Sequence, residues 1–574
     1  MRVVAPGRTR DAARDPNYKW VALSNTTLGA LMSAIDGSIV VISLPAIFNG
    51  IHVNPLDPGS TSYLLWTLTG YQLVTAVLVV AFGRLGDLHG RVRLYNAGFA
   101  VFTIGSLLLA ATPLSGDAGA QWIVLTRLVQ GIGGACLFAN SAAIITDAFP
   151  SSQRGLALGI NGVAVIAGQF IGLLAGGLLA VVNWRLVFFV SVPIGIAGTI
   201  WAYLRLEELG TVTRARIDWW GNLTFAAGLT AILIGVTYGI QPYGGQTMGW
   251  SSPFVLAMLL GGGALLALFL WIEARVDEPL FDLGLFRIRA FAAGNVAVLL
   301  SAIGRGGLSF VLVIWLQGIW LPLHGYDYAD TPLWAGIYML PLTLGFLIAG
   351  PVSGYLSDRY GARPFATGGM LLVAAAFLAF SQLPVLFAYP AFGLLLLAMG
   401  IGFGLFNSPN SAAVMNSVPA RERGAAAGVR SMSLLTGNVL SNGIVFSLLI
   451  GGLARGLPAA LQGGLVAHGV PASVAAAVAH LPPVSSLFAA LLGANPLASV
   501  LPAATLRALP TGQAADLVGK TFFPNLMAAP FGGALDVVFF ASAVISLVAA
   551  GASWLRGRRY VYEEGIAVEA GARD

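Results

Sequence analysis

Three ionisable residues, Asp36, Arg127 and Arg305, lie inside apolar runs that are long enough to cross a membrane. Asp36 interrupts the run LGALMSAIDGSIVVISLPAIF, where a carboxylate is unfavourable unless it faces a partner or a water-filled cavity. A nearby guanidinium favours the ionised carboxylate, whereas desolvation favours the protonated form. A movement that separates Asp36 from an arginine, or dries it, would make it take up a proton. We therefore predict a proton-coupling charge cluster of these three residues; the alternative is a static ion pair that fixes helix packing.

The composition is that of an integral membrane protein. Of the 574 residues, 57% are hydrophobic and 9% are charged, whereas a soluble domain carries roughly 25% charged residues. Apolar runs of about 20 residues recur from Trp20 to Trp554, without the period-two alternation of a membrane barrel. We predict an all-α fold with fourteen transmembrane helices. Arginines occupy alternate loops and both tails, which predicts a multi-pass protein of the plasma (inner) membrane with both termini cytoplasmic.

Several chemistries find no support in the sequence. The single cysteine, Cys136, excludes an intrachain disulfide and a cysteine cluster for a metal, and the five histidines all fall in loops. The chain lacks the GxxxxGK[ST] loop, which disfavours an ATP-driven pump, and we expect no cofactor. The basic residues lie in short loops and not on one domain, which argues against a nucleic-acid partner.

The chain also repeats itself. GRLGDLHGR at Gly83 matches GYLSDRYGAR at Gly354, and the NSAA at Asn140 recurs at Asn410. Duplicated helical bundles with a site at their interface are typical of transporters that work by alternating access. The predicted order is a cytoplasmic tail (1–19), a six-helix bundle (20–204), a linker with two inserted helices (205–289), a second six-helix bundle (290–555) with a long extracytoplasmic loop (453–532), and a cytoplasmic tail (556–574).

Four motifs in these elements resemble those of the major facilitator superfamily, specifically its fourteen-span drug:proton antiporters. The motifs are IDGSIVVISLPAI in the first span, the Gly83–Arg91 loop, RLVQGIGGA from Arg127, and a series of glycines in the fifth span. The resemblance covers nearly the whole chain except the long loop and the tails. It implies proton-coupled transport and not enzymatic activity.

The loop motif and the fifth span carry the expected moving parts. We expect a conformational latch in which Asp87 pairs with Arg91 or a neighbouring helix, and in which this contact breaks when the halves rock. The latch residues are Gly83, Asp87, Gly90 and Arg91, with Gly354, Asp358 and Gly361 in the second copy. Small residues recur every fourth position in the fifth span and let another helix approach closely, which predicts a sliding seam between the halves. The seam residues are Gly168, Gly172, Gly176 and Gly177.

A mostly apolar cavity with few polar groups suits hydrophobic or amphipathic ligands. Its expected residues are Gln130, Asn140, Trp315, Gln317 and Asn410, with Tyr71 and Phe406 as further aromatics. We expect a proton-coupled secondary transporter that exports hydrophobic or amphipathic small molecules, contacts membrane lipids, and is a monomer. The alternative is an exporter of lipids or cell-envelope precursors, which the apolar outside loop favours. A membrane-embedded enzyme and a passive channel are two weaker alternatives.

Overall fold

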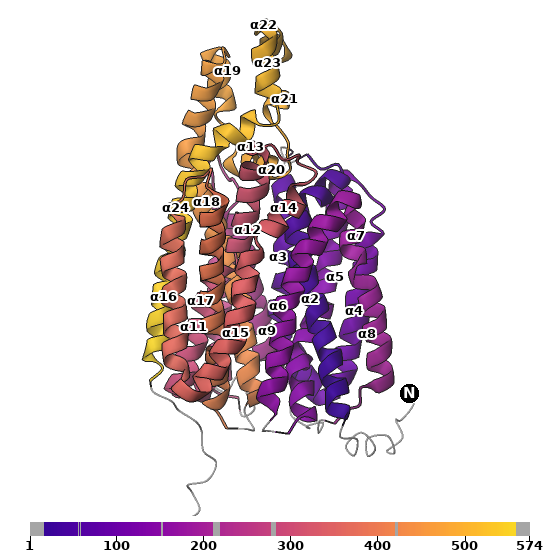
Figure 1. The fold of residues 1–574 in the computed structure, drawn as a ribbon. Coiled ribbons are helices and arrows are strands. Elements are labelled where there is room, and N and C mark those ends of the chain that lie inside the picture. Colours follow the sequence, from indigo (N-terminus) through magenta and orange to yellow (C-terminus); the bar gives the residue numbers. More distant parts are fainter. Residues whose placement is uncertain are drawn as a thin grey trace, which may run out of the picture.

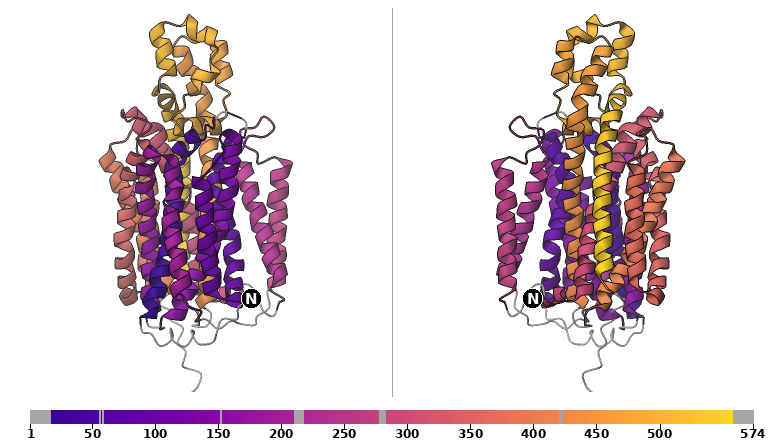
Figure 2. Two further views of the ribbon diagram at one scale, coloured as in Figure 1. Left: turned by 90° about the vertical axis from the view of Figure 1, so that its right-hand side faces the viewer. Right: turned by 90° about the vertical axis from the view of Figure 1, so that its left-hand side faces the viewer.

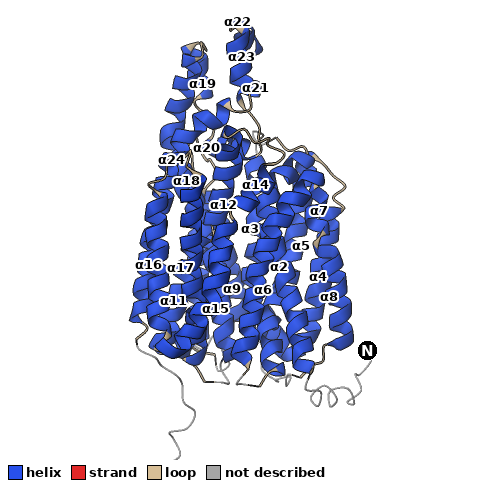
Figure 3. Ribbon diagram, viewed as in Figure 1, coloured by secondary structure: helices blue, strands red, loops and turns tan. Residues whose placement is uncertain are grey.

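The computed structural model describes residues 17–54, 57, 59–150, 153–209, 218–276, 283–419 and 423–557. The regular secondary structure of these residues is helical (Figure 3). Fourteen helices among them are long and apolar enough to cross a membrane, or fifteen if the bent pair α19 and α20 also forms a span. The predicted all-α membrane fold is therefore confirmed.

The first bundle runs from residue 18 to residue 205. It consists of α2 (Tyr18–Gly50), α3 (Ser60–His89), α4 (Arg91–Ala110), α5 (Gly116–Ala148), α6 (Arg154–Val182), α7 (Trp184–Phe189) and α8 (Ser191–Arg205). Helices α7 and α8 together make one candidate span. Gly90, with φ of 103°, ends α3 and lets α4 begin directly beside it, because a left-handed backbone angle suits glycine.

The second bundle begins with a span from Arg289 to Leu323. Its elements are α11 (Arg289–Arg305), α12 (Leu308–Val313), the π-helix η2 (Ile314–Trp320), α13 (Leu321–Leu323), α14 (Thr331–Tyr338), α15 (Leu340–Tyr360), α16 (Ala362–Phe380), α17 (Tyr389–Asn416), α18 (Arg423–Ala467) and α24 (Phe522–Leu555). The helix pairing of the first bundle recurs here. Helix α2 packs on α6 as α11 packs on α18, and α4 packs on α5 as α16 packs on α17.

Helices α9 (Trp219–Gly239) and α10 (Pro253–Glu273) stand at one side of the two bundles (Figure 2). They pack on each other, and α9 also contacts α3 and α18. They therefore lie beside the junction of the bundles and do not enter either bundle, as expected for two inserted helices.

Two helices of the second bundle project far beyond the others (Figure 1). Helix α24 has 34 residues and is about 51 Å long, whereas the apolar core of a bilayer is about 30 Å thick. The predicted loop over 453–532 is therefore shorter in the structure, because α18 continues to Ala467 and α24 begins at Phe522. Between them lie α19 (Ala472–Val478), α20 (Pro483–Leu491), α21 (Leu497–Val500), α22 (Ala503–Ala508) and α23 (Thr511–Val518).

We call α19–α23 the cap. The side of the bundles that bears the cap is the cap face, and the opposite side, which includes Gly90 and Gly361, is the motif face. All residues of α20 except Ser485 are buried. Helix α20 packs against α3 of the first bundle and against η2, α18 and α24 of the second. The cap is thus anchored between the bundles by α20 and is not a loop lying free on the surface.

Candidate functional site

Asp36 lies at the centre of a buried polar cluster. Its Oδ2 accepts a hydrogen bond from Arg127 Nη1 at 2.5 Å, and its Oδ1 accepts one from Gln130 Nε2 at 2.8 Å. Asp36 is 0% exposed and Arg127 is 2% exposed. The sequence places Arg127 and Gln130 three residues apart on α5, so both side chains reach the same point on α2. The structure therefore brings together two members of the predicted charge cluster, with Gln130 as a third.

Neighbouring helices hold the two partners of Asp36 in place. Arg127 Nη1 also donates to Gln130 Oε1 at 2.7 Å, and the Arg127 guanidinium lies 4.8 Å from the centre of the Tyr71 ring on α3. Gln130 Nε2 also donates to Ser106 Oγ on α4 at 2.9 Å. Four helices thus converge on one carboxylate. Removing one member of a buried ion pair leaves an uncompensated charge, which typically costs about 3–5 kcal/mol.

Arg305 does not belong to this cluster, which corrects the prediction. It is the last residue of α11, and its guanidinium carbon lies 5.8 Å from the centre of the Phe403 ring on α17. Within the described part of the chain, it forms no ion pair with Asp36 or another carboxylate. The repeat aligns SAIDG at 33–37 with SAIGR at 301–305, which places Arg305 within one residue of the position equivalent to Asp36. Equivalent positions on two bundles, however, need not face each other.

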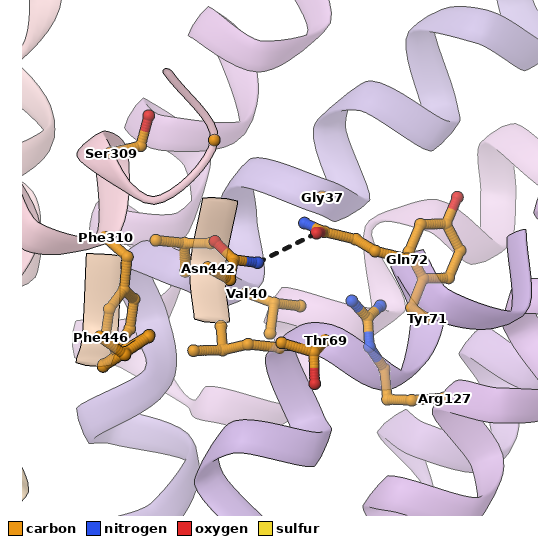
Figure 4. Close-up of a pocket in the computed structure, with 13 residues that line it drawn as sticks. Gly37, Val40, Thr69, Tyr71, Gln72, Arg127, Ser309, Phe310, Asn442 and Phe446 are labelled. Atoms are coloured by element: carbon orange, nitrogen blue, oxygen red, sulfur yellow. Dashed lines mark hydrogen bonds between the residues drawn. The ribbon is translucent and has the colours of Figure 1, made fainter. Parts of the chain in front are cut away.

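A small cavity lies between the two bundles next to the cluster (Figure 4). The residues that line it are Gly37, Val40, Val41, Leu68, Thr69, Tyr71, Gln72, Arg127, Gly306, Ser309, Phe310, Asn442 and Phe446. Asn442 Nδ2 donates to Gln72 Oε1 at 3.2 Å and so joins the bundles across it. Its volume is about 40 Å³, counted over the positions open to the centre of a water molecule. That is room for roughly three water molecules, so in this conformation the cavity is too small for a drug-sized ligand.

The cap covers this cavity. Phe310 and Phe446, which line the cavity opposite Arg127 in Figure 4, have ring centres 4.9 Å apart. Phe488 of α20 lies 6.3 Å from the first ring and 6.2 Å from the second. On the cap face, Asn49 of α2 donates to the Leu492 carbonyl at 3.1 Å. These contacts close the cap face between the bundles.

The other predicted cavity residues do not line the cavity. Asn140 donates to the Cys136 carbonyl at 2.9 Å, and Asn410 donates to the Gly294 carbonyl at 3.2 Å. Trp315 donates to the Val385 carbonyl at 2.9 Å and packs edge-on against two phenylalanines. Buried side chains in proteins often bond to backbone, and each of these three donates to a backbone carbonyl.

Gln317 has a different place from the one predicted. Its Nε2 donates to the Ile42 carbonyl of α2 at 3.0 Å, so it joins the bundles on the cap side of the cavity. The residues that sequence reasoning missed are Gln72, Ser309 and Asn442, each a polar side chain inside an apolar span. Their polarity was the available signal, but Asn140 and Asn410 carry the same signal and face elsewhere.

The predicted latch forms within one bundle. Arg91 Nε donates to Asp87 Oδ1 at 2.8 Å, and Arg91 Nη1 pairs with Asp147 at 2.7 Å. Glu208, which the sequence did not point to, accepts hydrogen bonds from the backbone N–H groups of Arg91 at 3.1 Å and Val92 at 3.0 Å. Because α3, α4 and α5 all belong to the first bundle, a rocking of the bundles need not break the Asp87–Arg91 pair. The structure shows the Asp87–Arg91 pairing, and the breaking of this pair during transport stays a prediction.

The second copy of the latch is built differently. Gly361 has φ of 85° and separates α15 from α16, as Gly90 separates α3 from α4. The guanidinium of Arg363 lies 3.6 Å from the centre of the Trp554 ring. A side chain added at Gly354 would meet Ser408, whereas Gly83 faces open space. The side chain of Asp358 lies outside the described residues.

The predicted seam on α6 faces mostly its own bundle. A methyl group added at Gly168 would lie 2.7 Å from the Leu31 carbonyl oxygen of α2, and one at Gly172 would lie 2.6 Å from that of Ile35. Gly176 likewise packs on Ile39 of α2. Only Gly177 meets the second bundle, where an added methyl would lie 2.9 Å from the Pro332 carbonyl oxygen. The seam therefore binds α6 to α2, and the prediction of a seam between the halves holds for Gly177 alone.

Comparison with known sequences agrees with this architecture. The sequence profile of the Major Facilitator Superfamily matches residues 26–218 and 212–442. Among curated proteins, the chain is 28% identical to the tetracenomycin C resistance and export protein of Streptomyces glaucescens, over 92% of this chain and 91% of that protein. It is 29% identical to the multidrug resistance protein Stp of Mycobacterium tuberculosis, over 77% of this chain and 78% of that protein.

A third relative is named for the transport of riboflavin. The chain is 29% identical to the riboflavin transporter RibZ of Clostridioides difficile, over 71% of this chain and 83% of that protein. Among solved structures, a bacterial homologue of the human lysosomal transporter Spinster in an inward-facing, occupied conformation gives a TM-score of 0.57 at 16% identity, over 96% of this chain and 100% of that chain. At this identity the likeness concerns the fold alone.

Proposed function

This chain belongs to the major facilitator superfamily of membrane transporters, and we propose that it exports hydrophobic or amphipathic small molecules in exchange for protons. The observation that carries the proposal is the fully buried Asp36, held by Arg127 and Gln130 beside a cavity between two bundles. Buried carboxylates in membrane spans commonly lie on proton pathways. Relatives named for tetracenomycin C export and for multidrug resistance support the direction and the substrate class.

Arg127 links the proton to the substrate in this proposal. Its guanidinium pairs with Asp36 and also lines the cavity. Protonation of Asp36 would leave this guanidinium without its counter-ion, and an unpaired charge on the cavity lining disfavours the apolar part of a substrate there. Proton binding and substrate binding therefore oppose each other through one side chain, as exchange requires, and no second carboxylate is needed.

Alternating access requires that contacts on one face of the protein separate while those on the other face form. On the cap face, Asn49, Gln317 and Phe488 make contacts that must separate before the cavity opens there. We take the motif face to be cytoplasmic, since the arginine-rich loops lie there. Substrate would enter from the motif face and leave past α20 in this scheme.

An exporter of lipids or cell-envelope precursors is the second candidate. The observation that favours it is the cap, which stands beyond the bundles and carries the exposed apolar side chains Val500 and Val518; Val466, near the end of α18, is exposed too. An apolar surface at the exit of the cavity could receive a lipid tail.

The test uses purified protein in liposomes with an imposed proton gradient. A panel of neutral, cationic and anionic lipophilic dyes and of fluorescent lipids is offered to wild type, to Asp36→Asn and to Asp327→Asn. Asp327 is a matched control, because its carboxylate lies in an exposed loop and pairs weakly with Lys520 at 3.5 Å. We expect gradient-driven movement in wild type and Asp327→Asn and its loss in Asp36→Asn. Unchanged movement in Asp36→Asn would refute the proton-coupling role, and movement of lipids alone would favour the second candidate.

A further inference from the structure

Two arginines of the second bundle have no carboxylate partner among the residues that the structure describes. Arg305 ends α11, and Arg430 lies on α18. Neither forms an ion pair with a described residue, and no described nitrogen or oxygen bonds Arg430 Nε, which is buried. A guanidinium inside a membrane span is unfavourable unless it meets water, an acceptor or a counter-ion. Both side chains are half-buried and not fully enclosed, so an anion could reach their remaining donors.

Both guanidinium groups approach the same side of α17. Arg305 lies over the Phe403 ring at 5.8 Å, and Arg430 Nη2 donates to Asn407 Oδ1 at 2.9 Å. Phe403 and Asn407 are four residues apart on one helix, so their Cβ atoms are about 5–6 Å apart on the same face. One ligand group could thus contact both arginines.

Asn438 is a further polar side chain near these two arginines, and we call the surface formed by Arg305, Phe403, Arg430 and Asn438 the wall. Asn438 lies two helical turns from Arg430 on α18, and its Oδ1 is buried without a partner. An added methyl at Gly306, the residue after Arg305, would lie 2.8 Å from the Asn438 carbonyl oxygen, which brings α11 and α18 together at this point. The unpartnered Oδ1 is an acceptor, so it suits a hydroxyl or N–H group of a ligand, whereas only the nitrogen of this amide is a donor.

Gly306 lines the cavity described above and is adjacent to Arg305, whereas Arg430 lies nearer to the motif face on α18. The two arginines therefore lie near the cavity, on its motif-face side. On the opposite bundle, Arg127 also lines the cavity, but Asp36 neutralises it. Among the described arginines beside the cavity, those without a counter-ion thus belong to the second bundle.

We infer that Arg305 and Arg430 bind the anionic group of an amphipathic ligand, a carboxylate, sulfonate or phosphate, at the motif-face side of the cavity. Guanidinium groups suit such anions because they present several donors in a planar fork. The Phe403 ring supplies an apolar surface for the rest of the ligand. The inference rests on the proposed function, since it specifies the charge of the substrate. The same chemistry could come from a free organic anion or from a lipid headgroup.

The experiment compares two fluorescent probes with nearly the same aromatic skeleton. Anilinonaphthalene sulfonate carries a sulfonate, and phenylnaphthylamine is neutral. Saturable binding of each probe is measured to full-length protein in phosphatidylcholine liposomes, corrected for protein-free liposomes and without a proton gradient. The variants are Arg305→Gln, Arg430→Gln and Arg430→Lys. Arg185→Gln is the matched control, because Arg185 bonds the Thr112 carbonyl at 3.0 Å, far along the chain from this wall.

We expect Arg305→Gln and Arg430→Gln each to weaken sulfonate binding about tenfold or more, because a charge-assisted hydrogen bond is lost. Arg430→Lys should retain part of the affinity, and Arg185→Gln should retain all of it. Binding of the neutral probe should stay within about twofold throughout. Unchanged sulfonate binding in both glutamine variants, or an equal loss of both probes, would overturn the inference.

The two sources of the anion are separated by repeating the titration in liposomes that contain phosphatidylglycerol. If this lipid displaces the sulfonate from wild type, the site binds headgroups; if it does not, the site binds free amphipathic anions. Because no gradient is present, the outcome is independent of proton coupling. A transport assay that fails while the arginine-dependent binding stands would refute the proposed function and leave the anion site intact.

Discussion

The energetic coupling of Asp36 and Arg127 can be tested by removing each charge alone and both together. The Arg127 Nη1–Asp36 Oδ2 distance is 2.5 Å, and both side chains are almost fully buried. Arg127→Gln leaves a buried carboxylate, and Asp36→Asn leaves a buried guanidinium, so each should lower the free energy of unfolding by about 3–5 kcal/mol. The double variant leaves neither charge and should cost less than the sum by at least about 1.5 kcal/mol.

The assay is a denaturant titration of the purified protein in detergent, followed by tryptophan fluorescence and extrapolated linearly to zero denaturant. Arg185→Gln is again the control, because its guanidinium is at the surface and its loss should cost about 1 kcal/mol or less. Gln130 keeps its bond to Asp36 Oδ1 in the Arg127 variant, so the cost should lie at the low end of the range. If the losses in unfolding free energy of the two single variants simply add in the double variant, or are no larger than that of Arg185→Gln, Asp36 and Arg127 are not energetically coupled.

Gly172→Ala should destabilise the protein by about 1–3 kcal/mol in the same titration, because its methyl group would lie 2.6 Å from the Ile35 carbonyl oxygen. Gly159 faces open space, so Gly159→Ala should be neutral or stabilising. Equal effects of the two substitutions would contradict the α2–α6 packing. Phe488→Ala should raise the gradient-free leak of dye from liposomes above that of wild type and of the exposed cap variant Val500→Ala; an unchanged leak would show that α20 does not seal the cavity. Burial raises the pKa of the Glu208 carboxyl above its ordinary value, so its contribution to stability is greatest at low pH and is lost as pH rises through that raised pKa. The melting temperature of wild type, relative to that of Glu208→Gln, should therefore rise on acidification. A fall in this difference on acidification would show that the pKa is not raised.

The membrane fold could be predicted from the sequence because its signal is strong and local. Runs of about 20 apolar residues mark spans without any knowledge of packing. The span ends were harder where prolines occur. Pro458 lies inside α18 and Pro530 lies inside α24, so both helices run past residues that usually interrupt them. The cap is therefore built on longer helices than the sequence indicates.

The site was predicted in part. An aspartate and an arginine in apolar spans had few alternatives to pairing, and the structure pairs Asp36 with Arg127. Arg305 was misplaced because the internal repeat fixes a position along a helix but not the neighbour that its side chain faces. The asparagines Asn140 and Asn410 are polar like Asn442, yet each donates to a backbone carbonyl within its own bundle, and only the three-dimensional packing distinguishes the three.

The central claim is that Asp36 carries the proton that drives transport. The most direct test follows the pH inside liposomes with a trapped pH-sensitive dye while a substrate moves down its own gradient. We expect wild type to move protons against the substrate flow, and Asp36→Asn to let substrate equilibrate without any change in lumenal pH. Proton movement in Asp36→Asn equal to that in wild type would show that Asp36 does not carry the proton that drives transport.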